Sequence, residues 1–475
     1  MSSDRPGSGA ALAHLAEQAK PIAAIPPHDL LVFLLGITAL LGGALVLGRL
    51  AQRVGLPVIV GELATGILLG PSVFAKAAPD AAHWLLPTDP DRFHLLEAVG
   101  QLGVILFVGM TGTEMDVGAV LRRGRTAVRI SLGGLLIPLG LGVATGLLLP
   151  SGLLSATADT EVFALFLGVA MAVSAIPVIA RILVDLNLLQ HRIGQLTLAA
   201  GTVDDAVGWL LLSVVSALAT TGVRAGDVLV SVGSVAATVA VAIVLGRPVA
   251  EVALSWSTRR RATGDSPAAT VSLTCAVLII GGAAATQALR LEAIFGAFVV
   301  GMVIGSRRSF DPRLVGPLRL VVTGVLAPLF FALAGLRVDL SALARPTVLA
   351  AAAVVLAVAV AGKFLGAYLG ARRSRLGHWE ALAIGAGMNA RGVVEIVVAG
   401  TGLRLGVISP AGYTVVVLVA VATSVMAPPL LRWAVIRGAL VPAAPEPAGP
   451  RPLVPDVAGA TPAPRDGAPA PDPIV

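Results

Sequence analysis

Apolar stretches separated by short polar segments recur along the whole of this chain. The first reads LLVFLLGITALLGGALVLG and occupies residues 30–48. A helix of about 20 residues crosses the roughly 30 Å hydrocarbon core of a bilayer. The pattern therefore predicts an all-α polytopic membrane protein with thirteen transmembrane helices, at residues 29–48, 57–74, 95–112, 126–149, 162–184, 194–218, 228–246, 268–289, 292–306, 316–335, 346–370, 378–401 and 411–433.

The composition agrees with this pattern. Of the 475 residues 56% are hydrophobic and only 13% are charged, and the mean hydropathy is +0.91. Soluble proteins usually contain about 25% charged residues, so a soluble chain is excluded. The net charge of +7 does not indicate nucleic-acid binding, because most basic residues lie in loops between apolar segments. The single cysteine, Cys275, excludes an intrachain disulfide.

The distribution of Lys and Arg predicts the orientation. One alternating set of loops contains 21 basic residues and the other set contains seven. Since cytoplasmic loops accumulate Lys and Arg, the N-terminus is expected outside and the C-terminus in the cytoplasm of a plasma membrane. Residues 1–28 would form an extracytoplasmic segment and residues 29–437 a transmembrane domain. The Pro/Ala-rich residues 438–475 would form a disordered cytoplasmic tail.

Two pairs of segments are similar to one another at a constant spacing. GELATGILLGPSVF (61–74) resembles LEAIFGAFVVGMVIG (291–305), and LFVGMTGTEMDV (106–117) aligns with LFFALAGLRVDL (329–340). The copies begin seven crossings apart, an odd number, so they have opposite topology. We therefore expect two inverted five-helix repeats, at 57–218 and 292–433, with linker helices at 228–289. Shared composition of membrane helices is the alternative explanation. Inverted repeats are typical of secondary transporters, whose sites lie near the membrane midplane.

Two segments in matching positions of the repeats contain helix-breaking residues. Pro177 and Ser174 lie in LGVAMAVSAIPVIARILV, and Asn389 and Arg391 lie among glycines in IGAGMNARGVVEIVVAG. Proline removes a backbone donor and disrupts the helix before it, and serine can bond the freed backbone groups. Both segments are predicted to be discontinuous helices that frame a site. The alternative interpretation of Pro177 is a kink that serves only helix packing.

Charged residues at membrane depth lie beside these predicted breaks. GTVDDAVGW contains Asp204 and Asp205, and AVAVAGKFLGAYLG contains Lys363. Arg391 and Glu395 are four residues apart and could form an ion pair on one helix face. A charge at mid-bilayer costs about 2.5–3.5 kcal/mol on insertion scales, so it is rarely kept without a use. Ion pairs that only hold helices together are the structural alternative.

Adjacent acids on a helix point about 100° apart and cannot share one partner. One aspartate could therefore pair with Lys363, while the other faces a cavity as a titratable ligand for a proton or a monovalent cation. Thr202, Ser174 and backbone carbonyls would supply further oxygens. Competition between the cation and the proton for one acid would already be an exchange mechanism, without any cofactor.

SAIPVIARILVDLNLL, GTVDDAVGW, GKFLG and GMNARGVVEIVV together resemble the monovalent cation:proton antiporter-2 family, over residues 30 to 435. The resemblance implies a sodium/proton antiporter-like fold, a homodimer, and a core with two crossing broken helices that moves in an elevator-like alternation of access. It implies that Asp205 is the cation/proton carboxylate and that Asp204 pairs with Lys363. Two aspartates are similar to the electrogenic type, whereas the region around Arg391 and Glu395 is similar to plant exchangers that often carry potassium.

The sequence thus predicts a Na⁺/H⁺ exchanger, with K⁺ as a possible cation and the lipid bilayer as its surroundings. One alternative is a sodium-coupled symporter of an organic solute with the same inverted-repeat core, although few polar or aromatic groups are available for a solute. A membrane enzyme is disfavoured because no metal-ligand cluster, nucleophile–base pair or phosphate loop is present in the sequence. Glu62 and Glu292 are expected to be structural.

Overall fold

The structure, a computed structural model, describes residues 25–86, 90–115, 117–149, 151–156, 158–189, 191–221, 225–259, 267–307 and 310–440. Within these ranges the chain is helical, and its β structure is limited to an isolated bridge between Leu154 and Ile408. Most of the predicted N-terminal segment and of the predicted Pro/Ala-rich tail lie outside the described residues.

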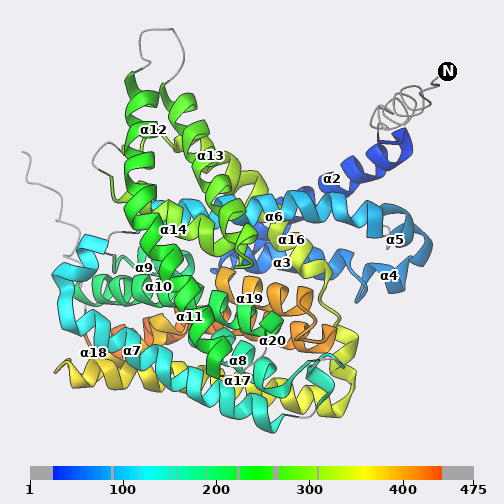
Figure 1. Cartoon of the computed structure of the whole chain (residues 1–475). Helices are drawn as coiled ribbons and strands as arrows, with labels where there is room; N and C mark the ends of the chain where they lie inside the picture. The colour runs from blue at the N-terminus through cyan, green and yellow to red at the C-terminus, as the bar shows by residue number, and fades with distance from the viewer. Residues whose placement is uncertain are drawn as a thin grey trace, which may run out of the picture.

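The helices follow one another along the chain as short and long rods (Figure 1). They are α2 (Pro27–Arg53), α3 (Val58–Leu69), α4 (Phe74–Ala77), α5 (Pro79–Leu85), α6 (Pro90–Thr113), α7 (Val117–Leu148), α8 (Thr160–Ala172), α9 (Ile176–Asp185), α10 (Arg192–Thr221), α11 (Ala225–Val241), α12 (Arg247–Arg259), α13 (Pro267–Ala288), α14 (Ala293–Gly305), α15 (Gly316–Val321), α16 (Ala327–Leu336), α17 (Pro346–Arg373), α18 (His378–Met388), α19 (Val393–Arg404) and α20 (Pro410–Arg437). Two π-helical turns, Ala242–Gly246 and Val322–Leu326, connect α11 to α12 and α15 to α16 without a loop.

The described residues contain 11 helices that are long and apolar enough to cross a membrane, or 12 when the bent pair α18–α19 is taken as one span. The predicted segment 292–306 corresponds to α14, an apolar helix of only 13 residues. The multi-pass helical architecture is therefore confirmed, and the exact number of thirteen is not.

The helices pack in two groups. In the first, which we call the α3–α16 group, α3 contacts α2 and α16, while α14 contacts α6 and α13. In the second, the α7–α17 group, α7 contacts α8, α10 and α17, while α18 contacts α17 and α20. Figure 1 shows α7 and α17 side by side along the bottom of the molecule, α2 and α6 in its upper half, and α3 below α6 at mid-height. The groups meet where α10 packs against α14 and α20 against α3.

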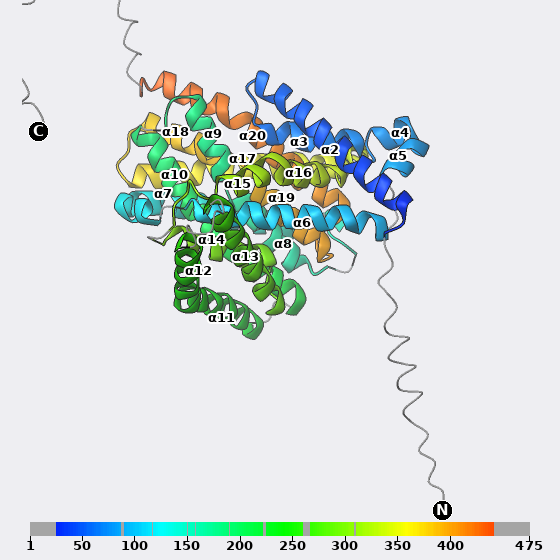
Figure 2. The same cartoon turned by 90° about the horizontal axis from the view of Figure 1, so that it is seen from above.

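Seen from above, α11, α12 and α13 lie at one edge of the molecule (Figure 2). Their outward side chains are large and apolar, as at Leu229, Val252 and Leu273, which are 66–74% exposed. In contrast, α8 is buried along nearly its whole length. This distribution fits a bundle with a lipid-facing surface and its least accessible helix at the centre.

Glycines permit close helix approaches within the α3–α16 group. A Cβ on Gly66 would strike the backbone of α16 near Gly335, and a Cβ on Gly112 would strike the backbone of α14 near Gly301. The first crossing joins predicted segments 57–74 and 316–335, and the second joins predicted segments 95–112 and 292–306. The first segment of each predicted repeat thus packs against the second segment of the other, as an internal two-fold relation requires. The division into repeats at 57–218 and 292–433 stays a prediction.

Candidate functional site

The first break separates α8 from α9. Helical structure ends at Ala172, residues 173–175 are extended, and helical structure resumes at Ile176. Pro177 lies in the first turn of α9, where its missing N–H would have no partner within the helix in any case. The predicted discontinuity in this segment is confirmed, and Pro177 begins the second half-helix rather than kinking a continuous one.

The second break separates α18 from α19, whose axes differ by 43°. Residues 389–392 are not helical, and the Glu395 carboxylate accepts a hydrogen bond from the Gly392 backbone amide at 2.8 Å, which caps α19. The two breaks contact one another directly. The Ala175 amide donates to the Ala390 carbonyl at 3.1 Å, and the Ser174 hydroxyl lies 2.8 Å from the Met388 carbonyl oxygen. The predicted contact between two broken helices is confirmed.

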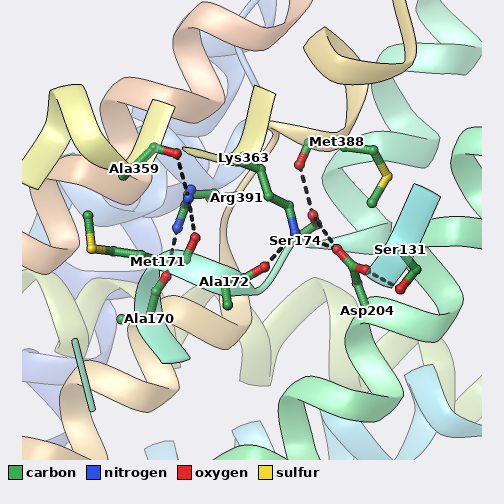
Figure 3. A network of polar contacts seen from close by, with 10 residues as sticks. All are labelled: Ser131, Ala170, Met171, Ala172, Ser174, Asp204, Ala359, Lys363, Met388 and Arg391. Atoms are coloured by element: carbon green, nitrogen blue, oxygen red, sulfur yellow. Dashed lines mark hydrogen bonds and ion pairs between the residues drawn. The ribbon is translucent and has the colours of Figure 1, made fainter. Parts of the chain in front are cut away.

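Asp204 has a complete set of partners between the two breaks (Figure 3). Its carboxylate forms an ion pair with Lys363 at 2.5 Å and accepts hydrogen bonds from Ser131 at 2.6 Å and Ser174 at 3.0 Å. Lys363 also donates to the Ala172 carbonyl at the end of α8. Both charged side chains are fully buried. The predicted pairing of Asp204 with Lys363 is confirmed.

Asp205 is in a different environment although it is the next residue. It is only 1% exposed, it forms no ion pair within 4.0 Å in the part of the chain that the structure describes, and its Oδ1 atom has no hydrogen-bond partner there. The backbone amide of Ile176, at the start of α9, is within hydrogen-bonding reach of its carboxylate. Asp205 is therefore a buried acid at the first break with one oxygen available for a ligand.

Arg391 holds the breaks together through backbone carbonyls. Its guanidinium donates to Ala170 at 2.7 Å, Met171 at 2.5 Å and Ala359 at 3.1 Å, as Figure 3 shows. These carbonyls belong to the last turn of α8 and to α17. The Ser424 hydroxyl donates to the Arg391 carbonyl from α20. The buried Arg391 guanidinium therefore donates hydrogen bonds to carbonyls at the C-terminus of α8, which have no partner within that helix.

The predicted ion pair between Arg391 and Glu395 is wrong. The described residues show no Arg391–Glu395 contact within 4.0 Å, since the guanidinium faces carbonyls and the carboxylate caps α19. The rule for residues four apart requires both to lie on one helix, and Arg391 precedes the first residue of α19.

The other predicted site residues are placed as follows. Ser174 contacts Asp204 and not Asp205 in this conformation. Thr202, three residues before Asp205, donates to the Leu198 carbonyl at 2.9 Å, so its oxygen lone pairs remain available. Asn389 is fully buried in the second break, and its amide atoms have no partner among the described residues.

Ser131 of α7 is a site residue that the sequence analysis missed. The signal that could have found it is the repeat: α7 and α17 cross at Gly133 and Gly366, and Ser131 and Lys363 each lie just before these glycines. In the predicted repeats, the position of the first repeat that corresponds to the lysine region therefore supplies a hydroxyl to the same carboxylate.

The buried charges of this site are Asp204, Asp205 and Glu395 as acids and Lys363 and Arg391 as bases. With all five ionised the site has a charge of −1, and a buried carboxylate without a counter-charge is strongly disfavoured. One proton or one monovalent cation on Asp205 restores neutrality. Crossing broken helices around such a set of charges define a secondary transporter of ions.

Comparison with known proteins identifies the family. The family model described as "Sodium/hydrogen exchanger, transmembrane" matches residues 36–437. The chain therefore belongs to the sodium/hydrogen exchangers, a family of monovalent cation:proton antiporters. This is a family of transporters and not of enzymes.

The names of similar proteins contain different cations. The Na⁺/H⁺ antiporter NhaS4 of Synechocystis is 30% identical over 405 residues, covering 85% of this chain and 97% of its own. Cation/H⁺ antiporter 20 of Arabidopsis thaliana is 32% identical over 78% of this chain, and K⁺/H⁺ antiporter 1 of Saccharomyces cerevisiae is 30% identical over 79%. The chain spans less than half of the length of these plant and yeast relatives, 45% and 43% respectively.

A solved structure shows the same fold. The sodium proton antiporter MjNhaP1 from Methanocaldococcus jannaschii superposes with a TM-score of 0.62 at 17% sequence identity, covering 87% of this chain and 98% of its own. The predicted sodium/proton antiporter-like fold is confirmed. The alternative of a sodium-coupled symporter of an organic solute finds no support in these relatives.

Proposed function

We propose that this protein exchanges Na⁺ for H⁺ across the membrane, and that Asp205 binds the two ions in alternation. The observation that carries the proposal is the contrast between the two aspartates. Asp204 is saturated by Lys363, Ser131 and Ser174, whereas Asp205 has an unpartnered oxygen and no counter-ion among the described residues.

Charge balance makes the binding exclusive. The loaded site is neutral with either a proton or a monovalent cation on Asp205, and binding both would leave an uncompensated positive charge. Carboxylate, hydroxyl and carbonyl oxygens suit a hard cation, and Thr202, Ser174 and the carbonyls freed at the breaks are the further ligands that we assign. No cofactor takes part in this exchange.

The ion pair of Asp204 with Lys363 has a positioning role. Lys363 of α17 bonds both α10, through Asp204, and the end of α8, through Ala172. It therefore keeps the first break next to Asp205. Arg391 does the same for the second break, since it connects residues 389–392 to α8 and α17.

Transport would follow from movement of the α7–α17 group, which contains the whole site, against the α3–α16 group. This is an elevator-type alternation of access in a homodimer. We place the protein in the plasma membrane with its N-terminus outside and its C-terminus in the cytoplasm, because basic residues concentrate in one set of loops.

The test is proton movement in proteoliposomes, followed with a pH-sensitive dye after Na⁺, K⁺ or Li⁺ is added in turn. The parent protein should respond to Na⁺, and Asp205→Asn, which cannot release a proton, should reduce exchange to the level of empty liposomes. Ser257→Ala is a control, because among the described residues its buried hydroxyl bonds the Leu254 carbonyl within α12.

A response to K⁺ and not to Na⁺ would be compatible with Asp205 as the ion-binding residue and would make K⁺ the exchanged cation. Normal exchange by Asp205→Asn would show that another group carries the ions. If no alkali cation evoked proton movement, the exchange itself would be refuted.

A further inference from the structure

Helix α10 carries a line of polar side chains that starts at Asp205, and the exchange chemistry described above uses none of the others. Asp205, Trp209, Ser213 and Ser216 are spaced by four, four and three residues, so they lie on one face of the helix. We call these four residues the α10 stripe. With 1.5 Å of rise per residue the stripe covers about 17 Å, roughly half of the hydrocarbon core.

The stripe is buried and its polar atoms are unpaired. Its four residues are 0–6% exposed. Asp205 Oδ1, Trp209 Nε1, Ser213 Oγ and Ser216 Oγ all lack a hydrogen-bond partner among the described residues. Leaving such groups unbonded in an apolar interior is unfavourable, so four in a row on one face call for an explanation.

Serine and threonine in a helix usually bond a carbonyl of the preceding turn. Thr197, Thr202 and Thr220 of α10 do so, at 2.8–2.9 Å. Ser213 and Ser216 do not. Their hydroxyls are therefore available to another ligand, although each could instead donate a hydrogen bond to a carbonyl of the preceding turn.

The stripe faces the boundary between the two helix groups. The ring of Trp209 packs against Phe298 of α14, with 5.9 Å between ring centroids and 39° between ring planes. α10 belongs to the α7–α17 group and α14 to the α3–α16 group, so this ring contact separates when the groups move against one another.

We propose that the α10 stripe is the path by which water and the transported ions reach Asp205 from the side of the membrane where α10 ends at Thr221. The hydroxyls of Ser213 and Ser216 and the indole N–H of Trp209 solvate this path. Phe298 closes the path in the present conformation by covering Trp209. The inference rests on the proposed function and adds a route to its binding site.

The experiment is cysteine labelling in a Cys275→Ala background, which removes the single native cysteine. Ser213→Cys and Ser216→Cys are treated in liposomes with a small, membrane-impermeant thiosulfonate, applied to one side at a time during exchange. The matched controls are Val215→Cys and Leu218→Cys, which are similarly buried neighbours that lie off the stripe. Gln101→Cys, which lines the cavity between α6, α14, α16 and α19, is a positive control for labelling of a cavity position.

Ser213→Cys and Ser216→Cys should be labelled from the Thr221 side at least about tenfold faster than the controls, which is the effect of a barrier lower by about 1.4 kcal/mol. Equal labelling of stripe and control positions, or labelling from the opposite side, would overturn the path. The variant Ser213→Ala/Ser216→Ala should exchange about tenfold more slowly than Ser257→Ala, and an unchanged rate would also refute the path.

Labelling measures access and not exchange, so the two proposals fail separately. If Asp205→Asn exchanged normally while the stripe was labelled, the carrier assignment would be wrong and the path would stand. If Asp205→Asn were inactive while the stripe reacted no faster than its controls, the path would be wrong and the carrier would stand.

Discussion

At the scale of single residues, the two neighbouring aspartates differ because successive helix positions point in directions about 100° apart. Asp204 points between α7, α8 and α17, where it meets Ser131, Ser174 and Lys363. Asp205 points to the start of α9 and is the first residue of the α10 stripe. Identical side chains are therefore in different environments: the Asp204 carboxylate lies in a bonded network, and the Asp205 carboxylate has an oxygen without a partner among the described residues.

Removing one charge from the buried Asp204–Lys363 pair should destabilise the folded protein more than removing both charges. Lys363→Ala leaves Asp204 buried without its counter-ion, at a cost of about 3–5 kcal/mol. Adding Asp204→Asn removes the uncompensated charge, so the double variant should melt at a higher temperature than Lys363→Ala. Thermal unfolding of both proteins in the same detergent measures this.

The control for this pair is Arg319→Ala, which breaks the exposed ion pair with Glu114 and should cost no more than about 1 kcal/mol. A double variant that melts at or below the temperature of Lys363→Ala would contradict an ion pair as the source of the stability.

At the scale of the elements, the half-helices are held in place by side chains from continuous neighbours. α17 supplies Lys363 and α20 supplies Ser424, and both helices are 28 residues long and unbroken by loops. The continuous helices are themselves fixed by close backbone approach, because a Cβ on Gly366 of α17 would meet the Gly133 carbonyl of α7 and the reverse also holds. The geometry of the site thus depends on a crossing that contains no charged atom.

Gly366→Val should therefore inactivate the protein without touching an ion-binding group. The added side chain pushes α17 from α7, at a cost of about 1–3 kcal/mol, and moves Lys363, one turn away, relative to Asp204. Exchange measured per folded protein should fall markedly. Gly140→Ala, on an open face of α7, is the matched control and should retain full exchange.

Normal exchange by a well-folded Gly366→Val would show that the α7–α17 crossing does not position the lysine.

The elements of this site were predictable from the sequence to different degrees. Pro177 and the glycines around Asn389 marked both breaks, and the lysine at membrane depth marked the partner of an aspartate. The partners of Arg391 were not predictable, because the carbonyls of Ala170, Met171 and Ala359 become acceptors only after α8 ends beside α17. Local spacing misassigned Glu395 to Arg391 for the same reason, since the break interrupts the helix that the spacing assumes.

At the scale of the whole molecule, two ion pairs lie around the cavity between α6, α14, α16 and α19. Glu97 and Arg337, 2.5 Å apart, both belong to the α3–α16 group. Glu292 and Arg404, 2.9 Å apart, connect the start of α14 with the end of α19 and so join the two groups. The structural role expected for Glu292 is consistent with this contact.

Cross-linking distinguishes these two pairs. Glu292→Cys/Arg404→Cys joined by a short bis-maleimide in the Cys275→Ala background should stop exchange, because it would tie together the two groups that we propose to move against one another. Glu97→Cys/Arg337→Cys joined by the same reagent should exchange normally, because both residues move together. Exchange before and after cross-linking, with the extent of cross-linking read from peptide masses, provides the measurement.

Full exchange by cross-linked Glu292→Cys/Arg404→Cys would rule out relative movement of the groups at this contact.

The glycine crossings also determine how the protein can vary. At Gly66, Gly112, Gly133 and Gly366 the neighbouring backbone occupies the space of any side chain, so a library covering every substitution should show near-total intolerance there. Asp204 and Asp205 should be equally intolerant for chemical reasons, yet exchangers with altered cation preference can arise by changes around Asp205. The four crossing glycines cannot be replaced in this way. New cation specificities are therefore expected to evolve by changes elsewhere, while these glycines stay unchanged.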